Sequence, residues 1–515
     1  MPTPVPPRAV VRRAARPLGY RGLAVVLLTT IVVGVLGACT TPSAGPPPST
    51  ELVVGATAIP PTLDATSNDA AAIPQVMLYN VYQTMVKLDS DGKLVGLLAT
   101  EWTVSEDNLT YTFTLDPQAT FAGGRAVTAQ DVVWSMNRVK SSGVAVLKAQ
   151  MAVVDTAKAT DDHTVTVTLS KPSNAWLFNM SQTAGMVLDS TRTDFANATA
   201  GSGPYELESW TKGSDLVLRQ RADYAGTTPH FTKVTFRYFS DPNAENAAML
   251  SGGLDILSNL QAPQAIDQFA DPSRFTVVDG TTNGEVVLSF NHQTKVMQDQ
   301  RVRQAINYAI DRRALVDTVW NGKGALIGSM VPPTDPWYED LSGTYPYDPA
   351  KARQLLADAG YASGELKLRL RLPTLPYATA SGQFVASALT DVGIEVATDE
   401  LEFPARWLDL VFTQADYDMS IIAHVEPRDI VKYGQPSYYW RYDNPEVQRL
   451  LAQADAGTAD QQVTDMKKVA KILADDAAAD WLFLLPNLVV TTTGVTGVPK
   501  NATGLSFDLS QIARS

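Results

Sequence analysis

Residues 111–133 decide the fold, and they read YTFTLDPQATFAGGRAVTAQDVV. The first five alternate bulky apolar side chains with threonine, which is typical of a strand with one buried face. Further along, Thr128 is followed three residues later by Asp131. This spacing predicts a capped helix start, because both side chains can bond the free N–H groups of the first turn. A strand followed closely by a capped helix indicates a mixed α/β chain.

The same alternation of strands and helices continues on both sides of this stretch. Residues 51–55 (ELVVG) and 164–169 (TVTVTL) predict strands. Asp348 and Asn444 each precede a proline, which places an N-cap residue and a first-turn proline at the start of a helix. Gly360 is expected to end the first of these helices. Apolar residues recur at helical spacing in both, and we expect them to face the core.

The amino terminus carries the pattern of a secretory signal. Basic residues without an acidic one lead into the apolar run 23–36 (LAVVLLTTIVVGVL), which is short for a membrane span. Leu36-Gly37-Ala38-Cys39 at its end resembles the lipobox of bacterial lipoproteins. We expect residues 1–38 to be a lipoprotein signal peptide, Cys39 to carry lipid, and residues 39–50, rich in proline and serine, to be a tether. A plain signal peptide with an incidental cysteine and an N-terminal membrane anchor are the alternatives.

Charge and cysteine content narrow the classes of function. The formal net charge is −13, and basic residues leave with the signal, so the mature chain is more acidic still. No excess of basic charge remains to attract nucleic acid, and we expect no nucleic-acid partner. The single cysteine allows no intramolecular disulfide, so the fold depends on its hydrophobic cores.

Taken in chain order, segments of the body resemble the extracytoplasmic solute-binding proteins of the peptide/nickel (oligopeptide/dipeptide-type) ABC transporter family, solute-binding protein family 5. The densest match is the stretch quoted first, with FAGG at residues 121–124 between its strand and its helix. Each piece alone is a common pattern, but the order holds over nearly the whole mature chain. The other pieces are residues 61–64 (PTLD), 79–86 (YNVYQTMV), 98–102 (LATEW), 201–205 (GSGPY), 290–291 (FN), 301–306 (RVRQAI), 309–312 (AIDR), 347–349 (YDP), 359–361 (AGY) and 444–447 (NPEV).

The resemblance implies an α/β, two-lobed periplasmic-binding-protein-like fold (type II, cluster C) with an extra subdomain inserted in the first lobe. Lobe I is then expected to comprise residues 51–78, 199–284 and 486–515, the inserted subdomain residues 79–198, and lobe II residues 285–485. The lobes are expected to close on a ligand about a hinge. The implied partners are the permease subunits of an ABC importer. We expect a monomer outside the cytoplasmic membrane, held at its outer face by the lipid.

A segment rich in titratable side chains, residues 424–430 (HVEPRDI), follows a strand-like run. In peptide-binding members of the family, an aspartate in this region pairs with the α-amine of the ligand. Asp429 is the positional match, with Glu426 as the second choice. Arg428 could offer its planar fork to a carboxylate or phosphate. The alternative is that these three charged residues pair among themselves and only brace the loop.

Two further groups complete the predicted ligand site. Trp440 and Tyr439 are predicted as flat walls of the cleft, suited to a peptide or a sugar ring. A polar loop after the first strand is predicted to meet the ligand, with a simple turn as the alternative; it consists of Thr66, Ser67 and Asn68. The four histidines are scattered without metal-ligand spacing, so we expect no bound metal and no cofactor.

These expectations describe a binding protein and not an enzyme. An oligopeptide or dipeptide is the favoured ligand, and a metal chelate or an oligosaccharide is the alternative. The rival from another class is a lipid-anchored secreted hydrolase, but the sequence holds no HExxH or GxSxG motif and no cysteine free for nucleophilic work. A sensor built on the same fold is also compatible with the sequence.

Overall fold

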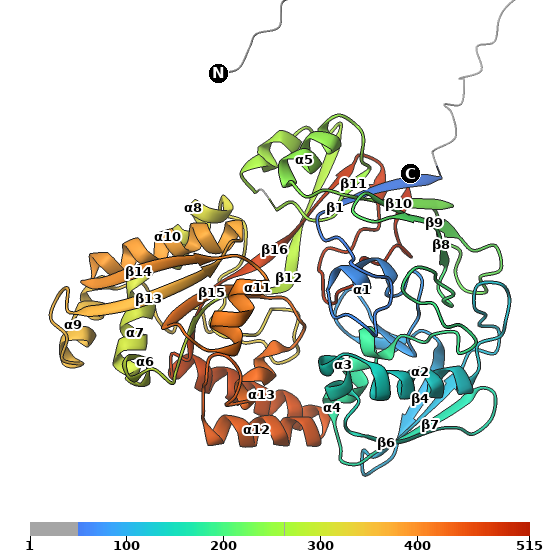
Figure 1. Cartoon of the computed structure of the whole chain (residues 1–515), viewed down its shortest axis with the longest axis horizontal. Coiled ribbons are helices and arrows are strands. Elements are labelled where there is room, and N and C mark those ends of the chain that lie inside the picture. Colours follow the sequence, from blue (N-terminus) through green and yellow to red (C-terminus); the bar gives the residue numbers. More distant parts are fainter. Residues whose placement is uncertain (1–49, 262) are drawn as a thin grey trace, which may run out of the picture. The chain divides into compact units, whose positions relative to one another are not determined.

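A sheet of ten strands runs through both lobes. Its order is β14-β13-β15-β12-β16-β11-β1-β10-β9-β8 (Figure 1), with parallel pairs β1–β10, β1–β11, β13–β14 and β13–β15 and antiparallel pairs elsewhere. The strand predicted at residues 51–55 is confirmed as β1. The bounds are β1 (Glu51–Ala56), β8 (Tyr205–Thr211), β9 (Asp215–Gln220), β10 (Lys233–Tyr238), β11 (Ile256–Leu257), β12 (Phe275–Phe290), β13 (Leu366–Pro373), β14 (Ile394–Leu401), β15 (Met419–His424) and β16 (Ala479–Thr492).

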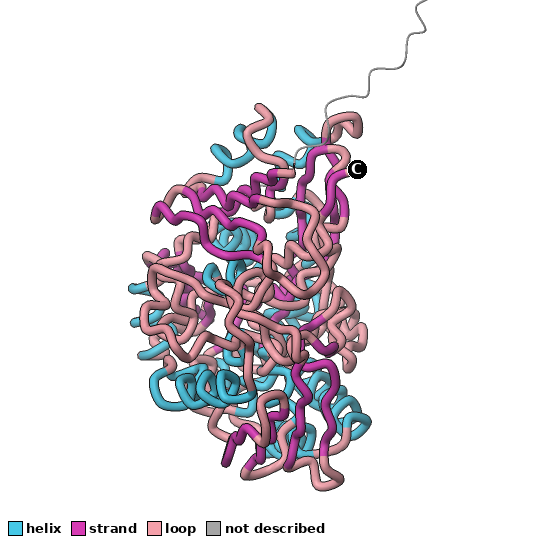
Figure 2. Tube along the Cα trace, turned by 90° about the vertical axis from the view of Figure 1, so that its right-hand side faces the viewer, coloured by secondary structure: helices cyan, strands magenta, loops and turns pink. Residues whose placement is uncertain are grey.

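The computed structural model describes residues 50–261 and 263–515 of the chain. The predicted signal peptide of residues 1–38, the lipidation site Cys39 and the tether up to residue 49 lie outside the described residues. Within the described ranges, no helix combines the length and the apolar character needed to cross a membrane. Figure 2 shows this part of the chain from the right of Figure 1, with strands near the top, long loops across the middle, and helices beside strands near the bottom.

The strands β12 and β16 are long because they pair twice, once in each lobe. Residues 275–281 of β12 pair with residues 486–492 of β16, and residues 285–289 pair with residues 479–484. The register shifts between the two halves, so the ladder is interrupted there. β11 continues the sheet beside the first half, and β15 continues it beside the second. The chain therefore crosses between the lobes on these two strands (Figure 1).

The segment that follows α1 contains a second sheet with its own core. Its four antiparallel strands lie in the order β4-β5-β7-β6. Both predictions from the decisive stretch are confirmed: β5 alternates buried and half-buried residues, and at the start of α2 the Asp131 carboxylate accepts hydrogen bonds from the N–H (3.0 Å) and hydroxyl (2.8 Å) of Thr128. The bounds are α1 (Ala72–Met77), β2 (Val86–Leu88), β3 (Leu94–Gly96), β4 (Ala99–Val104), β5 (Thr110–Leu115), α2 (Ala129–Ser142), α3 (Ala145–Gln150), β6 (Val154–Ala159), β7 (Thr164–Leu169), α4 (Asn174–Asn179) and η1 (Thr183–Gly185).

The second lobe supplies most of the remaining helices. The two predicted caps are confirmed: Asp348 accepts a hydrogen bond from the N–H of Lys351, and Asn444 accepts one from the N–H of Glu446. Gly360 follows the first of these helices with a left-handed φ of 92°. The bounds are α5 (Pro242–Leu250), η2 (Pro263–Phe269), α6 (Lys295–Gln298), α7 (Gln300–Ala309), α8 (Arg312–Trp320), α9 (Pro349–Asp358), α10 (Pro376–Asp391), α11 (Ala405–Trp407), η3 (Leu408–Thr413), η4 (Asp429–Gly434), α12 (Pro445–Ala456), α13 (Ala459–Asp475), β17 (Val495–Thr496) and β18 (Ala513–Arg514).

The core of the second lobe lies on both faces of its part of the sheet. Val286 and Leu288 of β12 pack into one hydrophobic cluster together with α7, α8, α9 and α10. Val287 packs into a second cluster together with α12 and α13. Because side chains alternate along a strand, Glu285 and Ser289 lie on the same face as Val287.

Candidate functional site

A chain of buried hydrogen bonds crosses the face of the second lobe that carries Val287. The Ser289 hydroxyl lies 2.6 Å from the Tyr439 hydroxyl, which lies 3.1 Å from Nε2 of His424. Nδ1 of His424 lies 3.0 Å from Oδ2 of Asp429. Strand alternation on the paired strands β12 and β15 brings Ser289 and His424 to this face, whereas Tyr439 and Asp429 come from the segment after β15. The chain of bonds ties that segment to the sheet.

Asp429 is the first residue of the short helix η4, and its side chain is buried. Its carboxylate pairs with His424 rather than with Arg428 or Glu426. The loop is therefore braced by a contact to β15. The predicted alternative, in which the three charged residues of the loop pair among themselves, is not the arrangement found.

Arg428 joins the second lobe to the segment that carries α4. Its backbone has a left-handed φ of 64°, and its guanidinium carbon lies 3.6 Å from the ring centre of Phe178 on α4 and 4.8 Å from that of Trp337. Burial lowers the pKa of the guanidinium to about 10. Nε of Arg428 has no hydrogen-bond partner among the described residues. A guanidinium held flat against aromatic rings can still donate its edge N–H groups to an anion.

Three further carboxyl groups interact with Arg428 and Asp429. Burial raises the pKa of Asp335 to about 6 and raises that of Glu285 well above the usual value of a glutamate. Burial, together with the charge of Asp429, also raises the pKa of Glu426. Oε2 of Glu285 and Oδ2 of Asp335 have no hydrogen-bond partner in the described part of the chain. Both atoms are therefore free to take a hydrogen bond from a ligand.

The two aromatic residues predicted as cleft walls lie in the core instead. Trp440 is 0% exposed and stacks on Tyr433, with ring centres 4.2 Å apart. Tyr439 is also buried, and it takes part in the chain of hydrogen bonds. The reason is local: this segment forms tight turns rather than a strand, so it does not alternate between two faces. Tyr438 is the partly exposed ring of the group.

The predicted polar loop of the first lobe forms a turn. The hydroxyl and N–H of Thr66 donate to Oδ1 of Asp64, and the carbonyl of Thr66 accepts from the N–H of Val144. Ser67 donates its hydroxyl to the carbonyl of Asp64, and the side chain of Asn68 accepts from the N–H two residues later. These contacts fix the loop beside α3. They do not link it to Asp429.

We call the group of Glu285, Asp335, Glu426, Arg428 and Asp429 the charged face. Sequence reasoning missed two of these residues and several that contact them. Glu285 carries a signal that could have been found, because it is a lone acid at the start of the apolar run of residues 286–288 (VVL). His424 belongs to the segment singled out from the sequence, but its position opposite Glu285 requires the pairing of β12 with β15. Phe178 and Trp337 are distant in sequence from Arg428, and no local pattern predicts that they stack on it.

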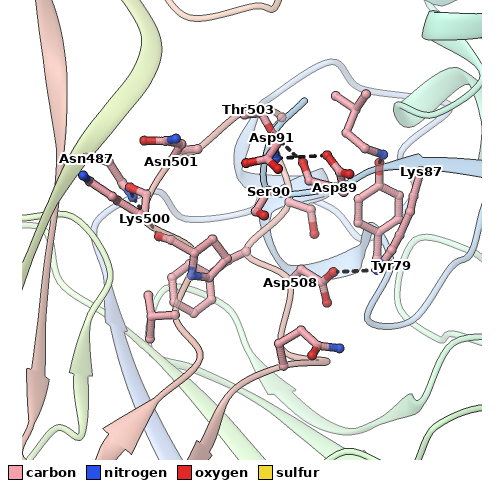
Figure 3. Close-up of a pocket in the computed structure, with 18 of the residues that line it drawn as sticks. Tyr79, Lys87, Asp89, Ser90, Asp91, Asn487, Lys500, Asn501, Thr503 and Asp508 are labelled. Carbon is pink, nitrogen blue, oxygen red and sulfur yellow. Dashed lines mark hydrogen bonds and ion pairs between the residues drawn. The ribbon is translucent and has the colours of Figure 1, made fainter. Parts of the chain in front are cut away.

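A cavity of about 640 Å³ lies between the hairpin of β2 and β3 and the C-terminal segment 497–511 (Figure 3). Lys87 and Asp508 form an ion pair of 3.2 Å in one wall, and Asn487 of β16 and Lys500 line the opposite side. The residues predicted from the sequence do not line this cavity. This cavity and the predicted ligand site therefore lie at different places in the molecule.

Known proteins match most of this chain. The family model described as "Bacterial extracellular solute-binding proteins, family 5 Middle" matches residues 93–440. The "Probable D,D-dipeptide-binding periplasmic protein DdpA" of Escherichia coli (strain K12) is 28% identical over 469 residues, which cover 85% of this chain and 89% of that protein.

Two solved structures share the architecture. NikA from Brucella suis, in complex with Fe(III)-EDTA, aligns with a TM-score of 0.80 at 20% identity and covers 90% of this chain and 100% of its own. DppA from Helicobacter pylori, in complex with the peptide STSA, aligns with a TM-score of 0.76 at 22% identity and covers 90% of this chain and 98% of its own. At this level of identity the likeness shows the fold alone, and it confirms the predicted two-lobed α/β fold.

Proposed function

Because this chain belongs to the bacterial extracellular solute-binding proteins of family 5, we propose that it captures a short peptide and delivers it to the permease subunits of an ABC importer. Family 5 proteins are extracytoplasmic substrate-binding proteins of such importers and not enzymes, and this protein is one of them. The relative named as a D,D-dipeptide-binding protein supports a peptide as the cargo. Structures of the same fold hold a peptide in one case and a metal chelate in another, so the fold does not decide the ligand.

The observation that carries the peptide proposal is the presence of opposite charges in one loop, with the guanidinium of Arg428 between the carboxyl groups of Glu426 and Asp429 in the chain. Arg428 supplies buried N–H donors, and Asp429 and Glu426 supply carboxylates close to it in the same loop. A peptide carries an ammonium group at one end and a carboxylate at the other, so it can satisfy both kinds of group at once. Closure of the cleft removes water, and each pair then gains more than the ~1 kcal/mol of an exposed ion pair.

Within this proposal, Asp429 accepts the α-amine of the peptide, with Glu426 as the second choice, and Arg428 binds a carboxylate. Tyr439 supports Asp429 indirectly, through the hydrogen bonds that run from Tyr439 to it. Trp440 holds the turn from the core rather than touching the ligand. The first lobe contributes a loop of three polar residues to the ligand site, namely Thr66, Ser67 and Asn68.

We further propose that the lobes follow the boundaries given by the family resemblance. Lobe I comprises residues 51–78, 199–284 and 486–515, the inserted subdomain residues 79–198, and lobe II residues 285–485. The interruption of the β12–β16 ladder gives the hinge a place to bend. The contact of Arg428 with Phe178 then belongs to the closed form.

The proposal also covers the location of the protein in the cell. After cleavage behind residue 38, Cys39 would carry the lipid that holds a monomeric receptor at the outer face of the cytoplasmic membrane. The tether would leave the two-lobed body free to meet its permease. Radiolabelled palmitate incorporation, compared between the native chain and Cys39→Ser, tests this point, and equal labelling of the two would refute it.

Native mass spectrometry of freshly purified protein tests the cargo. We expect a retained mass that fragments as a peptide and that leaves the protein unchanged on release. A retained oligosaccharide or metal chelate would overturn the proposal, as would conversion of an added peptide into products.

The roles of the two carboxylates are separated by a thermodynamic cycle. After the retained ligand has been removed, calorimetry compares a peptide with its N-acetylated form, in the native chain and in Asp429→Asn and Glu426→Gln. We expect acetylation to weaken binding to the native chain more than about tenfold, because it removes the ammonium charge. The carboxylate that pairs with the amine is identified by the variant in which acetylation no longer matters. Equal sensitivity in all three proteins would show that neither carboxylate binds the amine.

A further inference from the structure

The charged face holds more acid than a simple zwitterionic ligand needs. Four carboxyl groups lie there, those of Glu285, Asp335, Glu426 and Asp429, and the guanidinium of Arg428 acts on that of Asp335. The two ring nitrogens of His424 bond Asp429 and Tyr439, so neither is free to bond Glu285 or Asp335. One carboxylate would meet the α-amine of a bound peptide. The carboxyl groups of Glu285 and Asp335, which lie outside the loop that carries Glu426 and Asp429, are then left without an assigned partner.

Glu285 is a deeply buried member of this group. It is 1% exposed, and its Oε2 has no hydrogen-bond partner among the described residues. The charged groups that act on it are themselves acids, namely Asp429, Asp335 and Glu426. Its neighbour across the sheet is His424, in register on β15. A buried carboxyl without a partner is costly, so a bound cation that supplied the missing partner would be favoured at Glu285.

Asp335 provides the second, independent observation. It lies in the loop that also carries Trp337, one of the two rings against Arg428. Its Oδ2 is buried and has no hydrogen-bond partner in the residues described, and the charge that acts on it favourably is that of Arg428. Glu285 comes from the hinge strand β12, whereas Asp335 comes from a loop some fifty residues later in the chain. Two separate elements therefore direct unsatisfied carboxyl oxygens to one region.

We propose that Glu285 and Asp335 form a second cation subsite and that the cargo is a peptide with a basic side chain in addition to its α-amine. The inference rests on the proposed function, because it names the class of peptide that the same site selects. Attraction between buried opposite charges is much stronger than in water, so an enclosed excess of acid favours a cationic ligand. The buried guanidinium of Arg428 calls for a carboxylate on the same ligand, which favours a basic peptide over a simple diamine.

The test compares peptides of equal length and different charge. The ligand-free protein is titrated calorimetrically with Ala-Lys-Ala, Ala-Gln-Ala and Ala-Glu-Ala, and with cadaverine as a diamine without a carboxylate. We expect Ala-Lys-Ala to bind at least about tenfold more tightly than Ala-Gln-Ala, with Ala-Glu-Ala the weakest of the three. In Glu285→Gln the preference for lysine over glutamine should fall below about threefold, mainly through weaker binding of Ala-Lys-Ala.

A matched control is available in the first lobe. Glu245 on α5 is also buried, and both of its carboxyl oxygens lack hydrogen-bond partners among the described residues. Glu245→Gln makes the same chemical change away from the charged face and should leave the preference for lysine intact. If Glu285→Gln does not fold, Asp335→Asn tests the same subsite, with the same expected loss of preference.

The outcomes separate this inference from the proposed function. Equal affinity for all three peptides in the native chain, or an unchanged lysine preference in both Glu285→Gln and Asp335→Asn, would overturn the second subsite and leave peptide binding standing. Binding of cadaverine without binding of any peptide would overturn both.

Discussion

The contact between α4 and α12 offers a test of how closure is stabilised. Oδ1 of Asp455 on α12 accepts hydrogen bonds from the Ser173 hydroxyl and from the N–H of Ala175, each at 2.9 Å. Beside them, Nδ2 of Asn174 donates to the carbonyls of Ala454 (2.9 Å) and Gly457 (2.8 Å). We predict that Asp455→Ala weakens ligand binding although Asp455 does not belong to the charged face.

The magnitude follows from the hydrogen bonds that are lost. A hydrogen bond to a charged group contributes about 1.5–3 kcal/mol, and a partly exposed one contributes less because water competes for the same atoms. Asp455 is half-buried and accepts two such bonds, so we assign about 1–2 kcal/mol to the pair. In the proposed division α4 belongs to the inserted subdomain and α12 to lobe II, so we expect the loss to fall on the closed form alone. At 1.4 kcal/mol per factor of ten, the ligand should bind about 5- to 30-fold more weakly.

Calorimetry with the peptide identified by mass spectrometry measures the change in affinity, and small-angle X-ray scattering follows closure. Asp475→Ala is the control, because Asp475 forms a surface ion pair with Lys471 on α13 and its change should leave affinity within about twofold. Asn174→Ala removes the other half of the contact from the opposite element and should weaken binding in the same direction.

Two results would refute the reasoning. If Asp455→Ala binds ligand as tightly as the native chain, the α4–α12 contact does not favour the closed form. If it binds weakly but its ligand-free form unfolds several degrees earlier than that of Asp475→Ala, the contact stabilises the fold in all states rather than closure.

Two predictions concern stability. Burial raises the pKa of Glu245 to about 8, so the folded protein holds a proton that the unfolded chain releases at about pH 4.3. The free energy of unfolding should therefore fall by a few kcal/mol as pH rises from about 5 to 8. Urea unfolding at these two pH values measures the fall, and Glu245→Gln should remove the part that this carboxyl causes. An equal dependence of the unfolding free energy on pH in the native chain and in the variant would contradict the prediction. Trp440→Ala should cost the ligand-free protein about 3–5 kcal/mol, because it empties a core site against Tyr433. A loss below about 1 kcal/mol accompanied by weaker peptide binding would instead make Trp440 a wall of the cleft.

Local patterns predicted the secondary structure well where the cause is local. The alternation at residues 164–169 corresponds to β7, and the caps at Asp131, Asp348 and Asn444 all form. These features depend on side chains within a few residues of one another. For the same reason the sequence could not show that β12 and β16 pair in two lobes, since that pairing joins segments about two hundred residues apart.

The candidate site was only partly predictable. The segment with Glu426, Arg428 and Asp429 was found because three charged residues follow a strand-like run. Their partners come from long-range packing, so neither the ring of Phe178 against Arg428 nor the approach of Glu285 to Asp429 has a local signature. The burial of Trp440 was misjudged because a turn, and not a strand, carries it.

The double pairing of β12 with β16 has a consequence for protein engineering. In the proposed division the chain enters the second lobe at residue 285 and leaves it at residue 485, and Glu285 and Leu484 face each other across one antiparallel ladder. The lobe is thus a single continuous piece of polypeptide whose ends are neighbours. Such a piece can be excised with a short linker, exchanged between relatives, or circularly permuted without rerouting the backbone. The receptor could therefore be converted into a reporter by placing a fluorescent protein at this junction, where opening and closing would change the distance between its flanks.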